Sequence, residues 1–432
     1  MDFRNKRVIL LGAGKSNAAA AEYIYDHGGR IELREKYKSN AAPEFQRFCS
    51  VIKTGADYLD SLECDILVRT PVIRADIPEI EQARRSGALI TSETEIFFET
   101  TRAKIIAVTG SSGKTTTTSL IYHMLKKSGR NAYIGGNIGI PLLKYPDLSE
   151  KDIVAAELSS FQLSTLKTPP HTAVVTNIYP NHLDAHRSFD EYIEAKRNIV
   201  RCAPEKAVLN LDDETVRTFR GTKENIYFSM TDSSAEVFFK DGYIYLYGDK
   251  FFDVSKIKIP GKFNIKNYMA AIAAVCGEGN TDGILSAAEE FSGAPHRNQF
   301  IADIGGVNYV DSSIDSSPDR TAATLSAYTG NVILLAGGRG KGVPYDSLAE
   351  ILGSTVRLMI ITGENAAELV ETAGKSGVEY IIVQNYSDAV QYAKKRAQKG
   401  DTVLLSPAST SFDAFRNFEE RGDFFRKCVL EE

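Results

Sequence analysis

The sequence predicts a mixed α/β protein built from three domains. At 432 residues the chain is long for a single hydrophobic core, predicted strands alternate with predicted helices, and this alternation restarts along the chain. We expect an N-terminal Rossmann-like domain over residues 1–92 and a central P-loop domain with a small antiparallel β extension over residues 93–297. A C-terminal Rossmann-like domain is expected over residues 298–432.

Composition narrows the class of protein. The net charge of −5 gives no reason to expect nucleic-acid or membrane partners, because such partners need clustered basic residues. No apolar run approaches the ~18 residues that a membrane span needs, and the N-terminal segment does not resemble a signal peptide. The five cysteines are scattered without CxxC spacing, as is typical of reduced thiols. We therefore expect a soluble, cytoplasmic protein.

The first predicted domain opens with a strand that runs into a Gly-x-Gly turn, in Arg7-Val-Ile-Leu-Leu-Gly-Ala-Gly14. A helical pattern over residues 18–27 and a second strand over residues 30–33 complete a βαβ start similar to the dinucleotide-binding fingerprint. Asn17 replaces the third glycine, and Glu32 and Glu35 are both candidates for the acid after the second strand. This partial fingerprint leaves two interpretations open, a nucleotide-phosphate site and a plain βα turn. Later strands are expected over residues 66–69 and 89–91.

The second predicted domain carries the most informative motif, Thr109-Gly-Ser-Ser-Gly-Lys-Thr-Thr116, between a buried strand over residues 104–108 and a helical pattern over residues 115–126. A glycine-rich turn in this place directs backbone N–H groups and a helix N-terminus at one small volume, which suits polyphosphate. Lys114 can reach the β- and γ-phosphates, and the Thr115 hydroxyl can coordinate Mg²⁺. Val108 stands where the standard P-loop pattern has its first glycine. The motif predicts ATP binding.

Polar residues follow two further strands of this domain. Glu157 ends the strand over residues 152–157, and His182 and Asp184 follow the strand over residues 172–177. Ligands gather at the carboxyl ends of parallel strands, so Glu157 can bind Mg²⁺ beside the P-loop, and His182 and Asp184 can reach a metal or a substrate. The alternative for each is an ordinary solvated or packed side chain.

Two stretches outside the P-loop region have clear patterns. Residues 226–259 alternate apolar and polar side chains around an Asp241-Gly242 turn, which predicts antiparallel hairpins, and an alanine-rich helix follows over residues 261–277. From residue 293 the α/β alternation restarts, with strands expected over residues 307–311, 332–336, 358–362, 380–383 and 402–406.

Three basic positions have both a functional and a plain interpretation. Lys196 lies on a helix expected from about Ser188, where a lysine is usually a solvated surface residue. Arg297, next to His296 at the predicted domain junction, could reach a phosphate group with its forked donor. Lys341, in Gly337-Gly-Arg-Gly-Lys-Gly342, follows a buried strand and could meet a substrate carboxylate or remain a surface loop residue.

In this order the motifs resemble the Mur ligases, ATP-dependent amino-acid ligases of peptidoglycan precursor synthesis, nearly from end to end. The P-loop of that family also lacks the first glycine. The other matching segments are Gly135-Gly-Asn-Ile-Gly139, Glu157-Leu-Ser-Ser-Phe-Gln-Leu163, Asn181-His-Leu-Asp184, Tyr192-x-x-Ala-Lys196, Asn264-x-x-Asn267, Pro295-His-Arg297 and Leu405-Ser-Pro407. The segment that begins at Glu157 is most similar to the members that add D-glutamate to UDP-N-acetylmuramoyl-L-alanine. Ser406-Pro-x3-Ser411-Phe-Asp413 and Asn417-Phe-x-x-Arg-Gly422 point the same way.

The resemblance implies a role for each matching residue. ATP would be held by Gly110, Ser111, Ser112, Gly113, Lys114, Thr115, Thr116, Asn264, Asn267, Arg297 and Asp311. Two Mg²⁺ ions would be bound by Thr115, Glu157, His182 and Lys196, with the Lys196 amine carbamylated; the catalytic residues would be Lys114, Glu157, His182 and Lys196. The UDP-linked substrate would contact Gly12, Gly14, Ser16, Asn17, Asn137, Ser159 and Gln162. D-glutamate would contact Lys341, Ser411 and Phe418.

The implied activity is ATP-dependent amide formation through an acyl phosphate, with small-molecule substrates only. We expect a monomer. The alternatives within the class are a related Mur-type ligase that takes L-glutamate and a folylpolyglutamate synthase-like ligase; outside the class, the alternative is a nucleotide-gated binding protein without catalysis. One departure bears on the site. The Asp-Ser-Lys common in the family is Asp311-Ser-Ser-Ile314 here, so the lysine is absent and the contacts at this position are open.

Overall fold

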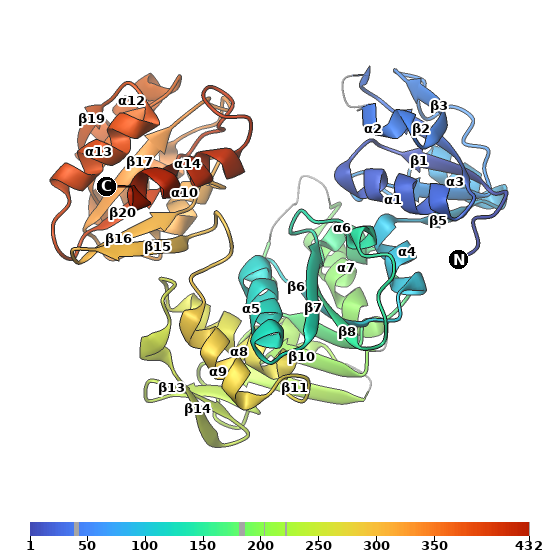
Figure 1. Cartoon of the computed structure of the whole chain (residues 1–432), viewed down its shortest axis with the longest axis horizontal. Helices are drawn as coiled ribbons and strands as arrows, with labels where there is room; N and C mark the ends of the chain where they lie inside the picture. Colours follow the sequence, from blue (N-terminus) through green and yellow to red (C-terminus); the bar gives the residue numbers. More distant parts are fainter. Residues whose placement is uncertain (39–42, 181–185, 203, 221–222, 432) are drawn as a thin grey trace. The chain divides into compact units, whose positions relative to one another are not determined.

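The computed structural model describes residues 1–432 except 39–42, 181–185, 203, 221–222 and 432. Its strands form three sheets, and helices alternate with many of the strands along the chain, as expected for the predicted α/β class (Figure 1). The chain divides into two compact units: unit 1 comprises Met1–Val254 and Ile265–Ala288, and unit 2 comprises Ser255–Asn264 and Glu289–Glu432. The domain boundaries expected after residues 92 and 297 stay predictions.

The first sheet of unit 1 is parallel throughout. Its strands are β1 (Arg7–Leu11), β2 (Arg30–Glu35), β3 (Cys49–Thr54), β4 (Ile66–Arg69) and β5 (Leu89–Thr91), and the helices in this part of the chain are α1 (Lys15–Asp26), α2 (Pro43–Gln46), α3 (Pro78–Arg85) and α4 (Glu93–Thr100). The strand order is β3-β2-β1-β4-β5. The chain reverses its direction of travel across the sheet between β1 and β4, which is where Rossmann-like sheets bind ligands.

The second sheet, also in unit 1, contains the P-loop strand. Its strands are β6 (Lys104–Thr109), β7 (Asn131–Gly136), β8 (Asp152–Glu157), β9 (Thr172–Val175), β10 (Lys206–Asn210), β11 (Glu224–Ser229), β12 (Val237–Lys240), β13 (Tyr243–Leu246) and β14 (Asp249–Asp253). The helices along this part of the chain are α5 (Lys114–Lys127), α6 (Ser160–Leu163), α7 (Phe189–Arg201), α8 (Phe263–Val275) and α9 (Thr281–Glu290), with short 3₁₀ turns η2 (Leu142–Lys144), η3 (Val216–Thr218) and η4 (Val254–Lys256). The order is β14-β13-β12-β11-β10-β9-β6-β8-β7, so β6 lies between β8 and β9.

The antiparallel extension of this sheet is smaller than expected. β11 pairs in parallel with β10, and β12 pairs in parallel with β11. Only β12, β13 and β14 are antiparallel, and the turn between β12 and β13 has φ values of 48° at Asp241 and 81° at Gly242, as a two-residue hairpin turn requires. The prediction of hairpins over residues 226–259 is therefore wrong for its first strand, because alternation reports which side of a strand is buried and not the direction of its neighbour.

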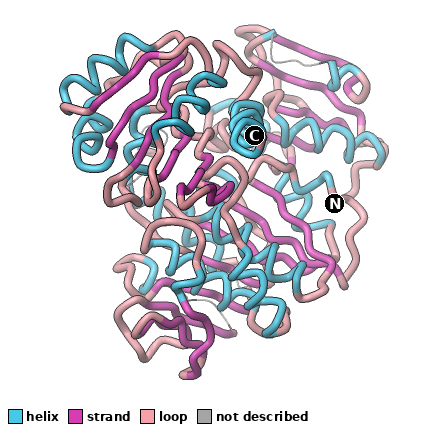
Figure 2. Tube along the Cα trace, turned by 60° about the vertical axis from the view of Figure 1, so that its left-hand side comes forward, coloured by secondary structure: helices cyan, strands magenta, loops and turns pink. Residues whose placement is uncertain are grey.

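The third sheet forms the centre of unit 2. Its strands are β15 (Gln299–Ile304), β16 (Val307–Asp311), β17 (Val332–Gly337), β18 (Val356–Thr362), β19 (Glu379–Ile382) and β20 (Thr402–Leu405), and its helices are α10 (Pro318–Leu325), α11 (Asp346–Thr355), α12 (Ala366–Ser376), α13 (Tyr386–Arg396) and α14 (Phe418–Leu430). The order is β15-β16-β20-β17-β18-β19, parallel except for the β15–β16 pair. The helices cover both faces (Figure 2). One core cluster contains side chains of α10, α11 and α12, and a second contains side chains of α13 and α14.

No helix in the described part of the chain is long and apolar enough to cross a membrane. All five cysteines are free thiols.

Candidate active site

The P-loop turn connects β6 to α5 and depends on two of its glycines. Gly110 has φ 151° and Gly113 has φ 80°, a region that side chains of L-residues rarely adopt. A Cβ atom at Gly110 would collide with the Thr176 hydroxyl, and one at Gly113 would collide with the Asn267 side-chain oxygen. The loop therefore needs glycine both for its backbone conformation and for close packing.

Residues at the end of β9 hold this loop in place. The Thr176 hydroxyl donates to the Ser112 carbonyl oxygen at 2.6 Å, and the Asn177 side-chain oxygen accepts from the Ser112 N–H at 2.9 Å. The Ser111 N–H donates to the Asn177 carbonyl oxygen at 2.8 Å, and the Ser111 hydroxyl lies 3.0 Å from the Tyr192 hydroxyl. These contacts fix Ser111 and Ser112, so the loop is preorganised.

Lys114 and Lys196 meet at one carbonyl oxygen of the loop. Lys114 Nζ donates to the Gly110 carbonyl at 2.9 Å, and Lys196 Nζ donates to the same oxygen at 2.8 Å. Lys196 is only 1% exposed, so its interpretation as a solvated surface residue is wrong. Burial, and then the charge of Lys114, holds the pKa of Lys196 well below its usual value. The Lys196 amine therefore loses its proton more readily than an exposed lysine does.

Glu157 places a carboxylate next to the P-loop. It ends β8, where it pairs with Val108 of β6, and it is 2% exposed. Its Oε1 accepts from the Asn137 amide at 2.7 Å. Its Oε2 is buried and has no hydrogen-bond partner among the described residues. A buried carboxylate oxygen without a partner beside a phosphate-binding loop fits a hard cation such as Mg²⁺, which prefers oxygen ligands.

Among the described residues, Glu157 does not belong to a cluster of side chains that could bind a metal ion without further ligands. The described residues contain no group of three or more His, Cys, Asp or Glu side chains that could hold a metal ion. His182 and Asp184, which the sequence offered for this purpose, lie outside the described residues. The metal-ligand roles expected for Thr115, His182 and Lys196 beside Glu157 therefore stay predictions.

Three residues expected to contact the UDP-linked substrate lie near Glu157 or on α6. Asn137 holds Glu157, as given above. Ser159 caps α6 and forms a reciprocal pair with Gln162: the Ser159 N–H donates to the Gln162 side-chain oxygen at 2.9 Å, and the Gln162 N–H donates to the Ser159 hydroxyl at 3.3 Å. The Gln162 amide also donates to the Thr94 hydroxyl at 3.1 Å. These side chains thus have structural partners, and their role toward a substrate stays a prediction.

The glycine turn after β1 is closed by its own neighbours. The Ala13 N–H donates to Glu35 Oε2 at 2.8 Å, which identifies Glu35, and not Glu32, as the acid at the turn. Asn17 is fully buried, and its amide donates to the carbonyl oxygens of Leu11 and Gly12 at 3.1 and 2.8 Å. Asn17 therefore fastens the turn from inside. Gly14 is the N-cap residue of α1 and Ser16 lies in the first turn of that helix. The contacts expected between these two residues and the UDP-linked substrate stay predictions.

The two asparagines expected at the nucleotide both lie on α8. Asn267 packs against the P-loop at Gly113, and its side-chain oxygen accepts from the Thr117 hydroxyl at 3.4 Å. Asn264 is also buried, and its amide donates to the Pro260 carbonyl at 2.5 Å.

In unit 2, Asp311 anchors a second group of predicted site residues. Its Oδ2 lies 2.9 Å from His296 Nδ1, and the His296 ring contacts Phe418 edge-to-face at 6.0 Å between centroids. Burial alone would favour neutral His296, but the hydrogen bond and charge of Asp311 outweigh it and raise the pKa of His296. A Cβ atom at Gly422 would collide with His296 and Asp311, so α14 approaches this pair only because it carries glycine there.

Lys341 and Ser411 lie on neighbouring loops at the carboxyl ends of β17 and β20. Lys341 Nζ donates to the Ser316 hydroxyl at 3.1 Å. Burial and the nearby charge of Arg320 lower the pKa of Lys341. Ser411 is buried, and its carbonyl oxygen accepts from the N–H groups of Ala414 and Phe415 at 3.1 and 2.8 Å.

Comparisons with known proteins now bear on this site. Two family models match the chain, the Mur ligase middle domain over residues 108–275 and the Mur ligase glutamate ligase domain over residues 296–409. The UDP-N-acetylmuramoylalanine–D-glutamate ligase of Ruminiclostridium cellulolyticum is 41% identical, with 99% of this chain and 97% of the relative covered. The enzyme of the same name from Clostridium acetobutylicum is 40% identical, with 99% and 96% covered. This chain belongs to the Mur ligase family.

Solved structures of Mur ligases share the fold. The UDP-N-acetylmuramate-alanine ligase MurC of Thermotoga maritima matches 99% of this chain and 100% of its own, with a TM-score of 0.61 at 19% identity. MurF of Acinetobacter baumannii matches 98% of this chain and 93% of its own, with a TM-score of 0.59 at 17% identity. The α/β class and the family resemblance expected from the sequence are thus confirmed.

Within this Mur ligase, the departure at Asp311-Ser-Ser-Ile314 is stabilised from α14. Asp311 Oδ1 accepts from the Ser313 N–H at 2.7 Å. Arg421, which is 0% exposed, donates through Nη2 to the carbonyl oxygens of Ser313 at 2.9 Å and Ser409 at 3.0 Å. Arg421 therefore ties the segment after β16 to the segment that carries Ser411.

Sequence reasoning missed several residues that shape the site. Thr176, Asn177 and Tyr192 received no role, although they hold the P-loop, and Arg421 was noticed only as part of a motif. A signal was present for two of them. Tyr192, Ala195, Lys196 and Ile199 lie on one stripe of α7 at helical spacing, and all are buried. Arg421, Phe425 and Val429 form a similar stripe on α14.

Proposed function

We propose that this Mur ligase adds D-glutamate to UDP-N-acetylmuramoyl-L-alanine in an ATP-dependent step of peptidoglycan precursor synthesis. The observation that carries the proposal is the 41% identity over nearly the whole chain to a ligase of that name. The grouping of the P-loop, Glu157 and Lys196 in one buried site supports it. The domain boundaries at residues 92 and 297 belong to the same proposal.

The reaction has two steps. In the first, an oxygen of the alanyl carboxylate attacks the γ-phosphorus of ATP, the bond to the β–γ bridging oxygen breaks, and ADP leaves, giving an acyl phosphate. In the second, the D-glutamate amine attacks the acyl carbon, inorganic phosphate leaves, and the nitrogen loses a proton to give the amide. Both steps bring negatively charged groups together, so the site needs fixed positive charge.

The residues of the P-loop supply part of that charge. Lys114 Nζ lies on the carbonyl oxygens of Gly110 and Ser111, at the place where the loop turns. When phosphate enters, its oxygens are better acceptors than these carbonyls, because a hydrogen bond between two charged groups is stronger than one to a neutral acceptor. Lys114 then stabilises the charge that develops on the transferred phosphoryl group.

Mur ligases in general use Mg²⁺, and we propose two ions here. Glu157 Oε2 would hold one ion together with Thr115 and phosphate oxygens, and a carbamate on Lys196 would supply a further carboxylate. Such ions would neutralise the charges of the phosphates and of the incoming carboxylate. Arg297 and Asp311 of unit 2 are proposed to contact ATP, and Lys341, Ser411 and Phe418 to hold D-glutamate.

A single assay tests the proposal. Phosphate release is measured with ATP and UDP-N-acetylmuramoyl-L-alanine in the presence of D-glutamate, L-glutamate or no amino acid. We expect sustained release with D-glutamate only. Release with L-glutamate would indicate the related ligase with the other amino-acid choice, and release with neither amino acid would indicate an uncoupled ATPase. No release with any of the three would remove the proposed activity.

We further propose that the enzyme acts in the cytoplasm as a monomer, on small-molecule substrates alone. Size-exclusion chromatography with light scattering checks the oligomeric state: a mass near 47.5 kDa is expected, and a stable mass of twice that value would contradict it.

A further inference from the structure

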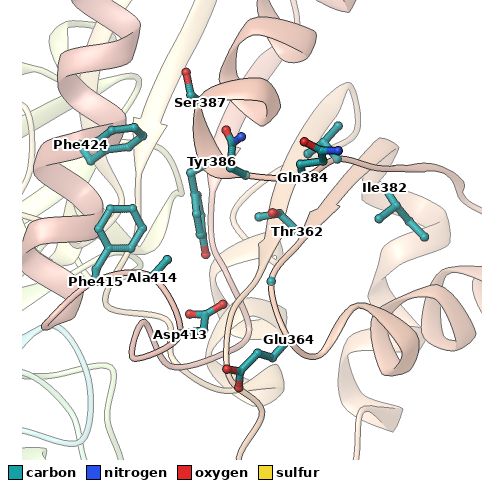
Figure 3. Close-up of a pocket in the computed structure, with 13 residues that line it drawn as sticks. Thr362, Glu364, Ile382, Gln384, Tyr386, Ser387, Asp413, Ala414, Phe415 and Phe424 are labelled. Carbon is teal, nitrogen blue, oxygen red and sulfur yellow. The ribbon is translucent and has the colours of Figure 1, made fainter.

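Unit 2 contains a cavity that the proposed reaction does not use (Figure 3). It has a volume of about 540 Å³ and lies at the carboxyl ends of β18 and β19, beside the first turn of α13. This volume is in the range of small-molecule sites, roughly 300–1,000 Å³. The side chains that decide its chemistry are Glu364, Tyr386, Asp413, Phe415 and Phe424.

The charge of the cavity is negative. Glu364 and Asp413 line it, and no described lysine, arginine or histidine does. Glu364 is already paired with Arg339 at 2.8 Å. Asp413 forms no ion pair with any described residue, and its Oδ1 is buried without a hydrogen-bond partner among them. Asp413 therefore lines the cavity with a carboxylate charge that no described cation pairs, and this charge favours a positively charged ligand.

Aromatic rings stand next to this carboxylate. Tyr386 and Phe415 pack edge-to-face with centroids 5.2 Å apart, and Phe415 and Phe424 are 5.5 Å apart. Figure 3 shows Phe415 and Phe424 on one side of Tyr386, with Asp413 near its hydroxyl end. Aromatic faces attract cations and also cover apolar groups. The cavity thus combines one available negative charge with surface for an apolar body.

The N-terminus of α13 at the rim would by itself favour an anion. That end is already satisfied from within the protein. The Asn385 side-chain oxygen accepts from the Asp388 N–H at 3.0 Å, and the Asp388 carboxylate adds a negative charge to the first turn. The helix end therefore does not reverse the preference that Asp413 sets.

The cavity lies next to the segments expected to hold the amino-acid substrate. The Tyr386 hydroxyl donates to the Gly337 carbonyl at 2.5 Å, at the start of the loop with Lys341. Asp413, Ala414 and Phe415 form part of its wall, yet neither Lys341, Ser411 nor Phe418 lines it. We propose that this cavity is a separate site for a small organic cation, an ammonium group on an apolar body. Only its separateness from the D-glutamate site rests on the proposed function.

Ligand-observed NMR on the full chain tests the proposal with three probes of similar shape: phenethylammonium, 2-phenylethanol and 3-phenylpropionate. We expect saturable binding of the cation, at least about tenfold tighter than either other probe, since only the cation pairs with Asp413. Equal binding of all three, tighter binding of the anion, or no binding of the cation would overturn the proposal. This comparison needs neither turnover nor a variant.

Two variants and one competitor locate the probe. Asp413→Asn keeps the shape of the side chain and should weaken phenethylammonium binding about tenfold, whereas Glu350→Gln, at an exposed acid of α11, should leave it unchanged. Unchanged binding in Asp413→Asn would overturn the assignment. Saturating D-glutamate should not displace the probe. Displacement would assign the cavity to the amino-acid substrate instead, and absence of ligase activity would leave the binding results as they stand.

Discussion

Lys114 is the residue whose loss should separate catalysis from folding most cleanly. Its Nζ donates to the Gly110 and Ser111 carbonyl oxygens of its own loop, at 2.9 and 3.2 Å, and Lys114 is not among the buried core residues of unit 1. We expect Lys114→Ala to lower phosphate release by about a thousand-fold or more, because one fixed donor is lost from the developing phosphoryl charge.

Circular dichroism and thermal unfolding should show that the Lys114→Ala variant is folded. The matched control is Lys127→Ala, an exposed lysine at the other end of α5, which should keep wild-type turnover. Substantial amide formation by Lys114→Ala would refute the P-loop assignment.

Burial also bears directly on the chemistry proposed for Lys196. Burial lowers its pKa, and the proposed carbamate needs the neutral amine, which would react with CO₂ and release one proton. We expect the Nζ of Lys196 to carry three additional non-hydrogen atoms in a crystal structure with Mg²⁺ and nucleotide bound. We also expect activity to fall when CO₂ is removed and to return with bicarbonate, and Lys196→Ala to be inactive.

The ¹³C NMR signal of a carbamate formed from ¹³C-bicarbonate should be present in the wild-type enzyme and absent from Lys196→Ala. An unmodified ammonium facing solvent in the metal- and nucleotide-bound crystal would sink the carbamate hypothesis, as would full activity of Lys196→Ala.

How much of the site could be predicted depends on whether a residue acts through the chain next to it or through packing. Lys114 and Glu157 follow buried strands, and parallel strands bring their carboxyl ends together, so their neighbourhood was predictable. Lys196 reaches Gly110 only because α7 packs its apolar stripe onto the sheet, which no local pattern specifies. Asn17 is a similar case, because its buried amide can stabilise the turn after β1 only once that turn has formed and brings the Gly12 carbonyl within reach.

At the scale of elements, burial helped the prediction of strands without deciding it: the edge strands β5 and β19 were expected, whereas the buried interior strand β10 was not. The apolar runs of β6, β8 and β17 are fully or almost fully buried and were expected within a residue or two. β3 has a burial pattern in which no residue is fully buried, and β15 has exposed residues at its end; neither was expected. An edge strand has one neighbour, so its sequence needs less apolar surface and gives a weaker pattern.

The helix α4 contains a carboxylate that should make unit 1 sensitive to pH. Glu93 is buried, and its Oε1 accepts from the Leu143 N–H at 2.8 Å, which ties α4 to η2. Burial raises the pKa of Glu93 to about 7, from an ordinary value of 4.5. The folded state thus holds a proton that the unfolded state gives up. Stability from this group is complete below the unfolded pKa and is lost as pH rises through about 7.

We therefore expect the free energy of unfolding of unit 1 to fall by about 3 kcal/mol at most between roughly pH 5 and pH 8. Glu93→Gln should remove most of this decrease. Glutamine keeps an oxygen for the Leu143 N–H and has no charge to desolvate. Denaturant titrations at both pH values measure this, with Glu99→Gln, at an exposed acid of the same helix, as the control. A pH dependence that is the same in Glu93→Gln and in the wild type would contradict the assignment.

At the scale of the whole molecule, the chain consists of two compact units, each with its own sheets and core. The hydrogen bonds considered at Glu93 and at Arg421 each lie within a single unit. Glu93 bonds within unit 1, and Arg421 bonds Ser313 and Ser409 within unit 2. Mutations at sites without common partners have additive effects on stability. We therefore expect two thermal transitions in calorimetry, because proteins of several compact units do not unfold in one step.

Arg421→Met should lower the transition of unit 2 alone. The Arg421 guanidinium is fully buried and forms no ion pair with a described residue. We therefore expect it to stabilise unit 2 through the hydrogen bonds that it donates to the Ser313 and Ser409 carbonyl oxygens. Leaving two buried carbonyls without that donor should cost about 2–3 kcal/mol and lower this transition by about 5 °C. Arg426→Met, at an exposed position of the same helix, should shift it far less. Glu93→Gln at pH 8 should raise the unit 1 transition alone, and a single transition that moves with both variants would refute the independence of the two units.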